Sequence, residues 1–328
     1  MSDYSHSVEE RVDAPKEGIP LSDYTVVRND IPLKKQWSER KCTMSSCYNK
    51  YFDRMINFKS KEDDLWIVTM PKCGTTWMQE TAWLVQSDFD FDKAKSIPLT
   101  ERSPFVELEG LYEGMPPTFD AAENLQSPRL LKSHLPASLL PKELWQNRSK
   151  IIYVARNVKD AVVSFQPFLE ALATFKGTKE QFIQAFMNDD LYYCPFWPHI
   201  LEFWEMRHEK NVYFTSYERM KKDLKGVLKD LCEFVGKPIP SEEILNQAVD
   251  HLSFDSMKKS SAGKAMQAVI DGIKDLNNNN DSNFQFMRRG IVGSHKDELT
   301  ADQIKSLDSW SEKFLNEAGV TSEEVFGL

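Results

Sequence analysis

Four short apolar runs constrain the fold of this chain more than any other feature. They are DLWIVT (64–69), RLLKS (129–133), KIIYVA (150–155) and NVYFTS (211–216). Helix-like segments follow three of them: TWMQETAWLVQ (76–86), KDAVVSFQPFL (159–169) and YERMKKDLKGVLKDLCEFVG (217–236). Short buried strands alternating with amphipathic helices predict βαβ units. We therefore expect a single α/β domain in which helices flank a central parallel β-sheet, with ligands at the carboxyl ends of the strands.

The helix expected over 217–236 has the clearest pattern. Its apolar residues recur every three or four positions and form one face: Leu224, Val227, Leu228, Leu231, Cys232 and Val235. Gly236 and Pro238 then predict the C-terminal end of the helix. The segment TWMQETAWLVQ likewise predicts a helix that buries Trp77, Thr81, Leu84 and Val85.

Composition limits the classes of function. A chain of 328 residues with 41% hydrophobic residues has ample length for a core, and a net charge of −9 argues against a nucleic-acid-binding protein. It has no apolar run long enough for a transmembrane helix and no apolar signal segment near its start, so we expect a cytoplasmic protein without membrane insertion. Five scattered cysteines predict neither a disulfide framework nor a zinc site.

Two polar segments are expected outside the core. Residues 1–35 predict a polar N-terminal arm, partly mobile, in which YTVVRN (24–29) could pair as an edge strand, and residues 36–328 form the domain proper. The tract NNNND (277–281) predicts a mobile loop.

The stretch MPKCGTTW (70–77) lies between the first predicted strand and its helix. Gly74 lets the backbone approach an anion, Thr75 and Thr76 add hydroxyl donors, and Lys72 adds a full charge at a helix N-terminus. These features predict a P-loop-like phosphate-binding loop. Its lysine precedes the glycine, which is the reverse of the G-x-x-x-x-G-K-[ST] order, so a nucleotide kinase or triphosphatase is disfavoured.

PKCGTTW resembles the 5′-phosphosulfate loop of the cytosolic sulfotransferases, which use 3′-phosphoadenosine 5′-phosphosulfate (PAPS) as donor. Three further stretches resemble that family in the same order: RLLKSHLP (129–136), YVARNVKDAVVSF (153–165) and FMRRGIVGSHKDELT (286–300). Each motif alone is weak, but four in order are specific. The resemblance implies transfer of a sulfuryl group from PAPS to a hydroxyl or amine, with the desulfated nucleotide PAP as product and no metal.

The resemblance also implies roles for individual residues. His134 matches the catalytic base, since an imidazole with a pKa near neutrality can accept a hydroxyl proton, and Lys72 and Lys132 match cations near the bridging oxygen. The phosphosulfate loop comprises Lys72, Cys73, Gly74, Thr75, Thr76 and Trp77. The 3′-phosphate would be held by Arg156, Ser164, Arg288, Arg289 and Gly290. The adenine would be contacted by Trp77, Tyr193, Ser253, Phe254 and Met287, although Leu252 replaces a common threonine.

Phe105 and Phe168, with His134, match the apolar pocket of a small lipophilic acceptor such as a phenol, a sterol or a retinoid-like alcohol.

Two departures from the family pattern have consequences. Cys73 replaces the serine that this loop usually has in the family. It is either a reactive thiolate, favoured by the helix N-terminus, or an inert residue whose small side chain fits the turn. KDELTADQIK (296–305) keeps Lys296 and Thr300 of the family's dimer motif, but Ala301 and Lys305 replace a valine and a glutamate, which predicts at most a weak homodimer.

Three other functions stay open at this point. A kinase of related fold would use the loop for ATP, but the loop order and the pair Arg156 and Ser164 speak against it. A silent binding protein for PAPS or a lipophilic hormone would not need Lys72, Lys132 and His134 together. Within the enzyme class, sulfonation of an allylic alcohol could create a leaving group and end in dehydration.

Overall fold

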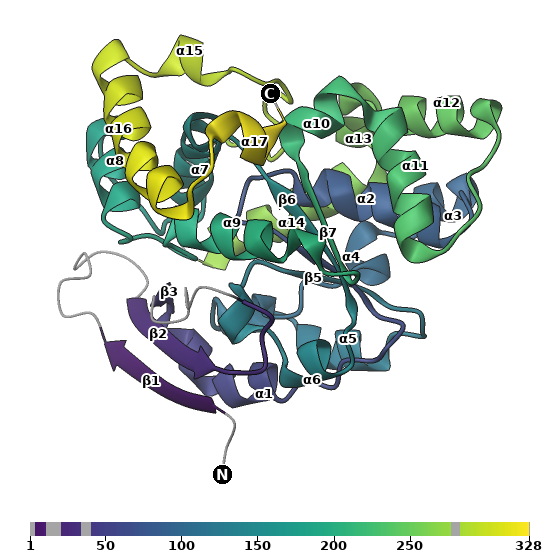
Figure 1. Cartoon of the computed structure of the whole chain (residues 1–328), viewed down its shortest axis with the longest axis horizontal. Helices are drawn as coiled ribbons and strands as arrows, with labels where there is room; N and C mark the ends of the chain where they lie inside the picture. Colours follow the sequence, from purple (N-terminus) through teal and green to yellow (C-terminus); the bar gives the residue numbers. More distant parts are fainter. Residues whose placement is uncertain (1–3, 11–20, 34–40, 277–282, 328) are drawn as a thin grey trace.

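The computed structural model describes residues 4–10, 21–33, 41–276 and 283–327, so the predicted loop 277–281 lies outside the described residues (Figure 1). The central sheet has four parallel strands in the order β5 (Leu130–Ser133), β4 (Leu65–Val68), β6 (Lys150–Ala155) and β7 (Val212–Ser216). The four predicted strands and the parallel sheet are confirmed.

Both faces of the sheet are buried, as expected for parallel strands. In β4, Trp66 and Val68 join one apolar cluster while Leu65 and Ile67 join the other, because successive side chains of a strand point to opposite faces. The first cluster includes residues of α7 (Val158–Ala171) and α9 (Phe196–Glu205), and the second includes residues of α2 (Thr75–Gln86) and α11 (Leu224–Val235). Helices therefore cover the two faces, and α2 and α7 begin shortly after β4 and β6, respectively.

The remaining elements connect this core. They are η2 (Ser46–Lys50), α1 (Phe52–Ile56), α3 (Phe91–Ser96), α4 (Leu99–Arg102), η3 (Leu108–Gly110), α5 (Thr118–Asn124), η4 (Ala137–Leu139), α6 (Lys142–Gln146), α8 (Lys179–Met187), η5 (Met206–His208), α10 (Tyr217–Lys222), α12 (Glu242–His251), α13 (Phe254–Lys259), α14 (Ser261–Leu276), α15 (His295–Glu298), α16 (Ala301–Ala318) and α17 (Ser322–Phe326). Within the described residues no helix is long and apolar enough to cross a bilayer.

The helix predicted over 217–236 is two helices. Asp223 ends α10 and, with its side chain, accepts a hydrogen bond from the Gly226 amide at 2.8 Å to start α11. An aspartate that caps the backbone in this way competes with helix continuation. The apolar face and the end of α11 are as predicted, since Val227, Leu228 and Leu231 are buried and Gly236 adopts the left-handed conformation with φ of 78°.

The N-terminal strand also differs from its prediction. β2 (Leu21–Arg28) is the central strand of a separate antiparallel sheet, between β1 (Tyr4–Glu10) and β3 (Cys42–Ser45), and not an edge strand. Leu21, Tyr24 and Val26 of this segment are buried. Arg28 donates from Nη1 to the Leu140 carbonyl at 2.6 Å. These contacts attach residues 21–28 to the main body.

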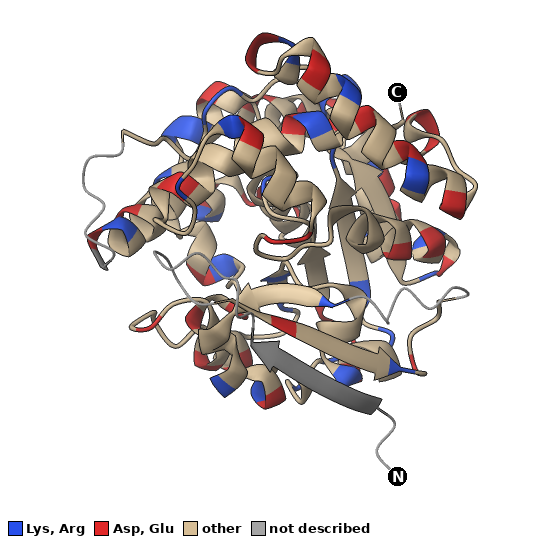
Figure 2. Ribbon diagram, turned by 90° about the vertical axis from the view of Figure 1, so that its left-hand side faces the viewer, with Lys and Arg blue, Asp and Glu red and all other residues tan. Residues whose placement is uncertain are grey.

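Helix α14 was not predicted, although apolar residues recur along it at helical spacing, at Met266, Val269, Ile270 and Ile273. The helix packs against α13 and α4 and borders the cavity described below. Figure 2 shows acidic and basic residues interspersed on the outer helices that face the viewer, without a basic face in that view.

Candidate active site

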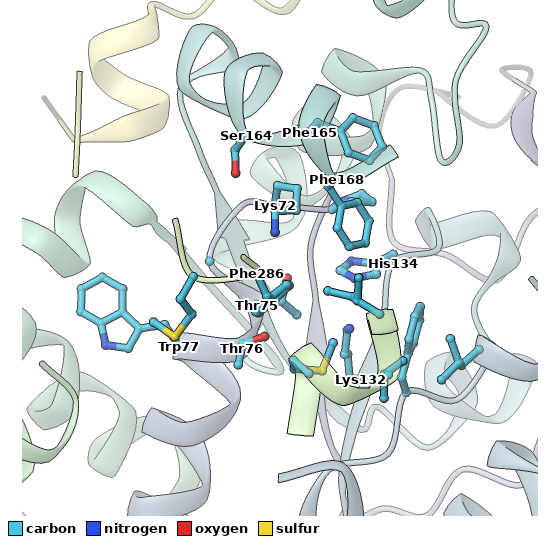
Figure 3. Close-up of a pocket in the computed structure, with 18 of the residues that line it drawn as sticks. Lys72, Thr75, Thr76, Trp77, Lys132, His134, Ser164, Phe165, Phe168 and Phe286 are labelled. Atoms are coloured by element: carbon cyan, nitrogen blue, oxygen red, sulfur yellow. The ribbon is translucent and has the colours of Figure 1, made fainter. Parts of the chain in front are cut away.

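A cavity of about 510 Å³ opens at the carboxyl ends of the four parallel strands (Figure 3). Lys72 follows β4, His134 follows β5, Arg156 follows β6 and Tyr217 follows β7, and all four line the cavity. The carboxyl ends of parallel strands lie at one edge of the sheet, so residues up to 145 positions apart in the sequence meet there. A cavity of this size suits a small-molecule site.

The loop between β4 and α2 has the geometry of an anion site. Gly74 precedes α2 with φ of 103°, and a Cβ at this position would lie 2.9 Å from Cδ2 of Tyr217. Only glycine fits here without strain. Thr75 and Thr76 line the cavity from the first turn of α2, where the backbone amides have no intrahelical partners. The hydroxyls of Thr75 and Thr69 lie 2.6 Å apart, which fixes the start of the helix.

Two lysines enter the cavity among aromatic rings. Lys72 Nζ lies 4.0 Å from the ring centre of Phe286 and 4.7 Å from that of Phe168, and Lys132 Nζ lies 3.9 Å from the ring centre of Phe105. Burial lowers the pKa of Lys72 to about 7, with neighbouring Arg156 and Lys132 adding to the effect. Burial lowers the pKa of Lys132 to about 8, against the opposing charge of Glu107. A bound anion would favour the charged form of both.

His134 is held as a neutral imidazole. Its Nδ1 lies 2.8 Å from the Thr69 carbonyl oxygen, which can only accept, so Nδ1 carries the proton and Nε2 carries the lone pair. Burial lowers the pKa of His134 well below its ordinary value, and the charge of Lys132 adds to this. The ring is 5.1 Å from that of Phe105, and the side chain lines the cavity. A neutral imidazole with a fixed tautomer is prepared to accept a proton.

Arg156 lines the cavity next to the phosphate-binding loop, where its guanidinium could bind an anion. Its Nη1 donates to the Lys72 carbonyl at 2.8 Å, and its guanidinium lies 4.4 Å over the ring of Tyr217. Its Nε is buried and has no hydrogen-bond partner among the described residues. Ser164, on the next helix, also lines the cavity. A buried donor that the protein leaves unpaired fits a ligand that accepts from it.

The segment around Gly290 closes the same end of the cavity. Gly290 has φ of 64°, and a Cβ there would lie 2.0 Å from Cδ2 of Phe254, so a side chain would displace that ring. Buried Asp160 of α7 anchors the segment by accepting from Gly293 N at 2.6 Å and His295 N at 3.0 Å. Arg288 and Arg289 line the cavity and also pair with the acidic Glu298.

Aromatic and aliphatic side chains line the cavity together with these cationic residues. Trp77 and Tyr217 meet edge to face with ring centres 5.5 Å apart, and Phe254, Met287 and Leu252 line the cavity with them. Tyr217 was missed by the sequence analysis. The rule that ligands gather at strand ends could have found it, because Tyr217 directly follows β7.

Three predicted residues are placed differently from expectation. The ring of Tyr193 lies 5.4 Å from that of His134, on the acceptor side. Exposed Ser253 caps α13 by accepting from Ser256 N at 3.3 Å and is not among the cavity-lining residues. Cys73 is buried in the core rather than lining the cavity, and burial raises its pKa to about 12. Burial disfavours the thiolate of Cys73, so the structure favours the alternative of an inert residue.

The other end of the cavity is apolar. Phe105 and Phe168 lie there as predicted, and α14 adds a wall that the sequence analysis did not anticipate. Further lining residues at this end are Leu108, Tyr112, Leu169, Tyr192, Met266, Val269, Ile270 and Ile273.

The fold and site together define a class. A phosphate loop and further cations hold an anion at one end, an apolar chamber holds a second molecule at the other, and a neutral imidazole lies between them. This arrangement is that of a group-transfer enzyme with an anionic donor.

Comparisons with known proteins give the family. Residues 62–319 match the model of the sulfotransferase domain. Sulfotransferase 1 family member D1 of Mus musculus is 34% identical over 278 residues, which cover 82% of this chain and 91% of that protein. Sulfotransferase 1A1 of Rattus norvegicus is 36% identical over 266 residues, covering 79% and 88%.

Solved structures agree in fold. A crystal structure of retinol dehydratase with androsterone and inactive cofactor PAP aligns over 97% of this chain and 98% of that one, with a TM-score of 0.82 and 20% identity. A mouse sulfotransferase complexed with PAP aligns over 84% and 91%, with a TM-score of 0.65 and 24% identity. This chain belongs to the sulfotransferase family. The predicted enzyme class and its donor, PAPS, are confirmed.

Proposed function

We propose that the protein transfers a sulfuryl group from PAPS to a hydroxyl or amine of a small lipophilic acceptor, with His134 as the general base. The observation that carries this proposal is the neutral His134, whose Nδ1 proton is held by the Thr69 carbonyl and whose Nε2 is left to accept. In the reaction the acceptor oxygen or nitrogen bonds to sulfur while the bond from sulfur to the bridging phosphate oxygen breaks. The acceptor proton moves to Nε2, and the electron pair of the broken bond stays on PAP, beside Lys72 and Lys132.

The cavity residues fit the nucleotide in parts. Gly74, Thr75, Thr76 and Lys72 would hold the 5′-phosphosulfate. Arg156, Ser164 and the segment Arg288–Gly290 would hold the 3′-phosphate, a fit supported by the unpaired Arg156 Nε and by the close approach of Gly290 to Phe254. The adenine would lie between Trp77 and Phe254, with Tyr217 taking the place first assigned to Tyr193. These residues supply positive charge themselves, so we propose a reaction without a metal.

The acceptor is proposed from the apolar end of the cavity. Phe105, Phe168 and the wall of α14 suit a flat or elongated hydrophobic body with one polar group near His134. Structures of retinol dehydratase contain androsterone or retinol. We therefore propose sterols and retinoid-like alcohols, as well as phenols, as candidate acceptors. A cytoplasmic location and at most a weak homodimer complete the proposal.

The test is incubation with labelled PAPS and a panel of phenols, sterols, retinoid-like alcohols and amines, followed by mass spectrometry. We expect a sulfate ester or sulfamate of at least one acceptor, together with PAP. An alkene product from an allylic alcohol would instead indicate elimination after sulfonation. Release of PAP without any modified acceptor, or binding without turnover, would contradict the proposal.

A further inference from the structure

Two acidic side chains pair with the arginines at the cationic end of the cavity, and neither was anticipated. Glu298 Oε2 accepts from Arg288 Nη1 at 2.8 Å, and its Oε1 lies 2.7 Å from Arg288 Nη2. The same Oε1 accepts from Arg289 Nη1 at 3.2 Å. Asp297 Oδ2 accepts from Arg289 Nη2 at 2.6 Å. One carboxylate, that of Glu298, therefore bridges both guanidinium groups.

This cluster of four side chains lies beside the residues proposed to hold the 3′-phosphate. Arg288 Nη2 also donates to the Val163 carbonyl at 3.2 Å, and Val163 directly precedes Ser164 in α7. Both arginines and Ser164 line the cavity, whereas Glu298 is not among the lining residues. Glu298 can therefore act on a ligand of the cavity through its charge and through the arginines, without contacting the ligand itself.

The charges of the cluster cancel. Two guanidinium groups carry a formal charge of +2, and the carboxylates of Glu298 and Asp297 carry −2. The side chain of Glu298 is 19% exposed, so water screens its charge less than that of Asp297, which is 64% exposed. Arg156 differs, because it donates to a main-chain carbonyl and keeps a buried Nε without a partner among the described residues. The full charge of Arg156 can thus act on an anion.

We propose that Glu298 is an affinity-determining residue, a built-in counter-charge that offsets Arg288 and Arg289 and weakens the binding of nucleotides that carry a 3′-phosphate. A phosphate that approaches these arginines meets a pair of cations already compensated by a carboxylate. PAPS and PAP both carry this phosphate, so Glu298 would weaken the binding of both and favour the release of PAP after transfer. This inference rests on the proposed 3′-phosphate site.

The experiment measures the Kd of PAP and of adenosine 5′-phosphate, which lacks the 3′-phosphate, by calorimetry at low ionic strength. Glu298→Gln removes the charge but keeps the size of the side chain and an oxygen that can accept from an arginine. The Kd of PAP should fall about three- to tenfold, on the scale of one partly screened charge. The Kd of adenosine 5′-phosphate should change by less than about twofold, because it places no phosphate at these arginines. Added salt should reduce the difference between variant and wild type in PAP binding.

Two further variants serve as controls. Asp297→Asn should tighten PAP binding less than Glu298→Gln does, because Asp297 pairs with Arg289 alone and is more exposed. Asp302→Asn removes an exposed carboxylate from the first turn of the following helix, α16. It should leave the Kd of both nucleotides as in wild type, which excludes an effect of net charge alone.

The sign of the change in Kd decides the proposal. Weaker binding of PAP to Glu298→Gln would mean that the carboxylate only orients the arginines, and this result would overturn the proposal. An unchanged Kd, or equal tightening for both nucleotides, would overturn it as well. A Glu298→Gln variant that fails to fold would do the same, because the carboxylate would then serve the fold.

Arg288→Met separates this inference from the proposed function. It should weaken the binding of PAP more than that of adenosine 5′-phosphate. Equal effects on the two nucleotides would remove Arg288 from the proposed 3′-phosphate site. Selective weakening of PAP by Arg288→Met, together with an unchanged Kd in Glu298→Gln, would reject only the role of Glu298. Turnover of PAPS is measured independently of both results.

Discussion

The two ends of the cavity are built in different ways. The cationic end uses residues that directly follow β4, β6 and β7, together with the segment around Gly290, and most of them lie in short motifs. The apolar end is assembled from side chains of η3, α7, α14 and the loop before α9, which are separated by long stretches of sequence. A phosphate site needs particular residue types at particular spacings, but an apolar wall needs only volume. Motifs therefore predict most of the first end, whereas of the second they predicted only Phe105 and Phe168.

The largest effect is expected where the two ends meet. His134→Ala should lower kcat by about 10²–10⁴-fold, the contribution of a positioned general base, because the variant has no group to take the proton from the acceptor. Binding of PAP, measured by calorimetry, should stay nearly unchanged, since no predicted nucleotide contact is removed. Activity close to wild type would remove His134 from the mechanism.

Arg156→Ala tests the cationic end alone. It should weaken PAPS binding by about 2–4 kcal/mol, the scale for truncating one partner of a buried charged contact. Adenosine 5′-phosphosulfate, which lacks the 3′-phosphate, should be affected far less. Similar losses for both nucleotides would mean that the 3′-phosphate binds elsewhere.

The low pKa of Lys72 predicts how PAP binding depends on pH. Burial lowers this pKa to about 7, and a bound anion favours the charged form, so binding should take up a proton above that pH. The Kd of PAP should then rise by up to about tenfold per pH unit as pH increases above 7. Lys72→Arg, which stays charged, should flatten this dependence. A Kd in wild type that does not change between about pH 7 and pH 8.5 would contradict the prediction.

Ile270→Ala tests the apolar end. Ile270 is 1% exposed and lines the cavity from α14, so truncation removes packing against the acceptor. The KM of a bulky acceptor should rise about tenfold, as for small changes in a hydrophobic pocket, with the KM of PAPS unchanged. Ile239→Ala, at an exposed site, is the control. If the KM of PAPS rose instead, α14 would contact the nucleotide rather than the acceptor.

Cys73→Ser should have the smallest effect, within about twofold in activity, because the side chain is buried outside the cavity and a hydroxyl has similar size. Alkylation of wild type should modify the partly exposed Cys47 well before Cys73. Mass spectrometry of partially alkylated protein checks the order. Rapid loss of activity with Cys73 as the first modified site would show that the loop opens to reagent.

By itself, the sequence determined the parallel sheet, its strand-end site and most of the cationic residues. Apolar runs with polar turns between them have few ways to bury their surface, and a phosphate loop is encoded within a few neighbouring positions. The tertiary structure decided the rest. It separated α10 from α11 at Asp223, buried Cys73, brought Tyr217 rather than Tyr193 beside Trp77, and closed the acceptor chamber with α14. Burial and side-chain proximity depend on how distant segments pack, and that packing also sets the pKa values of Lys72, Lys132 and His134.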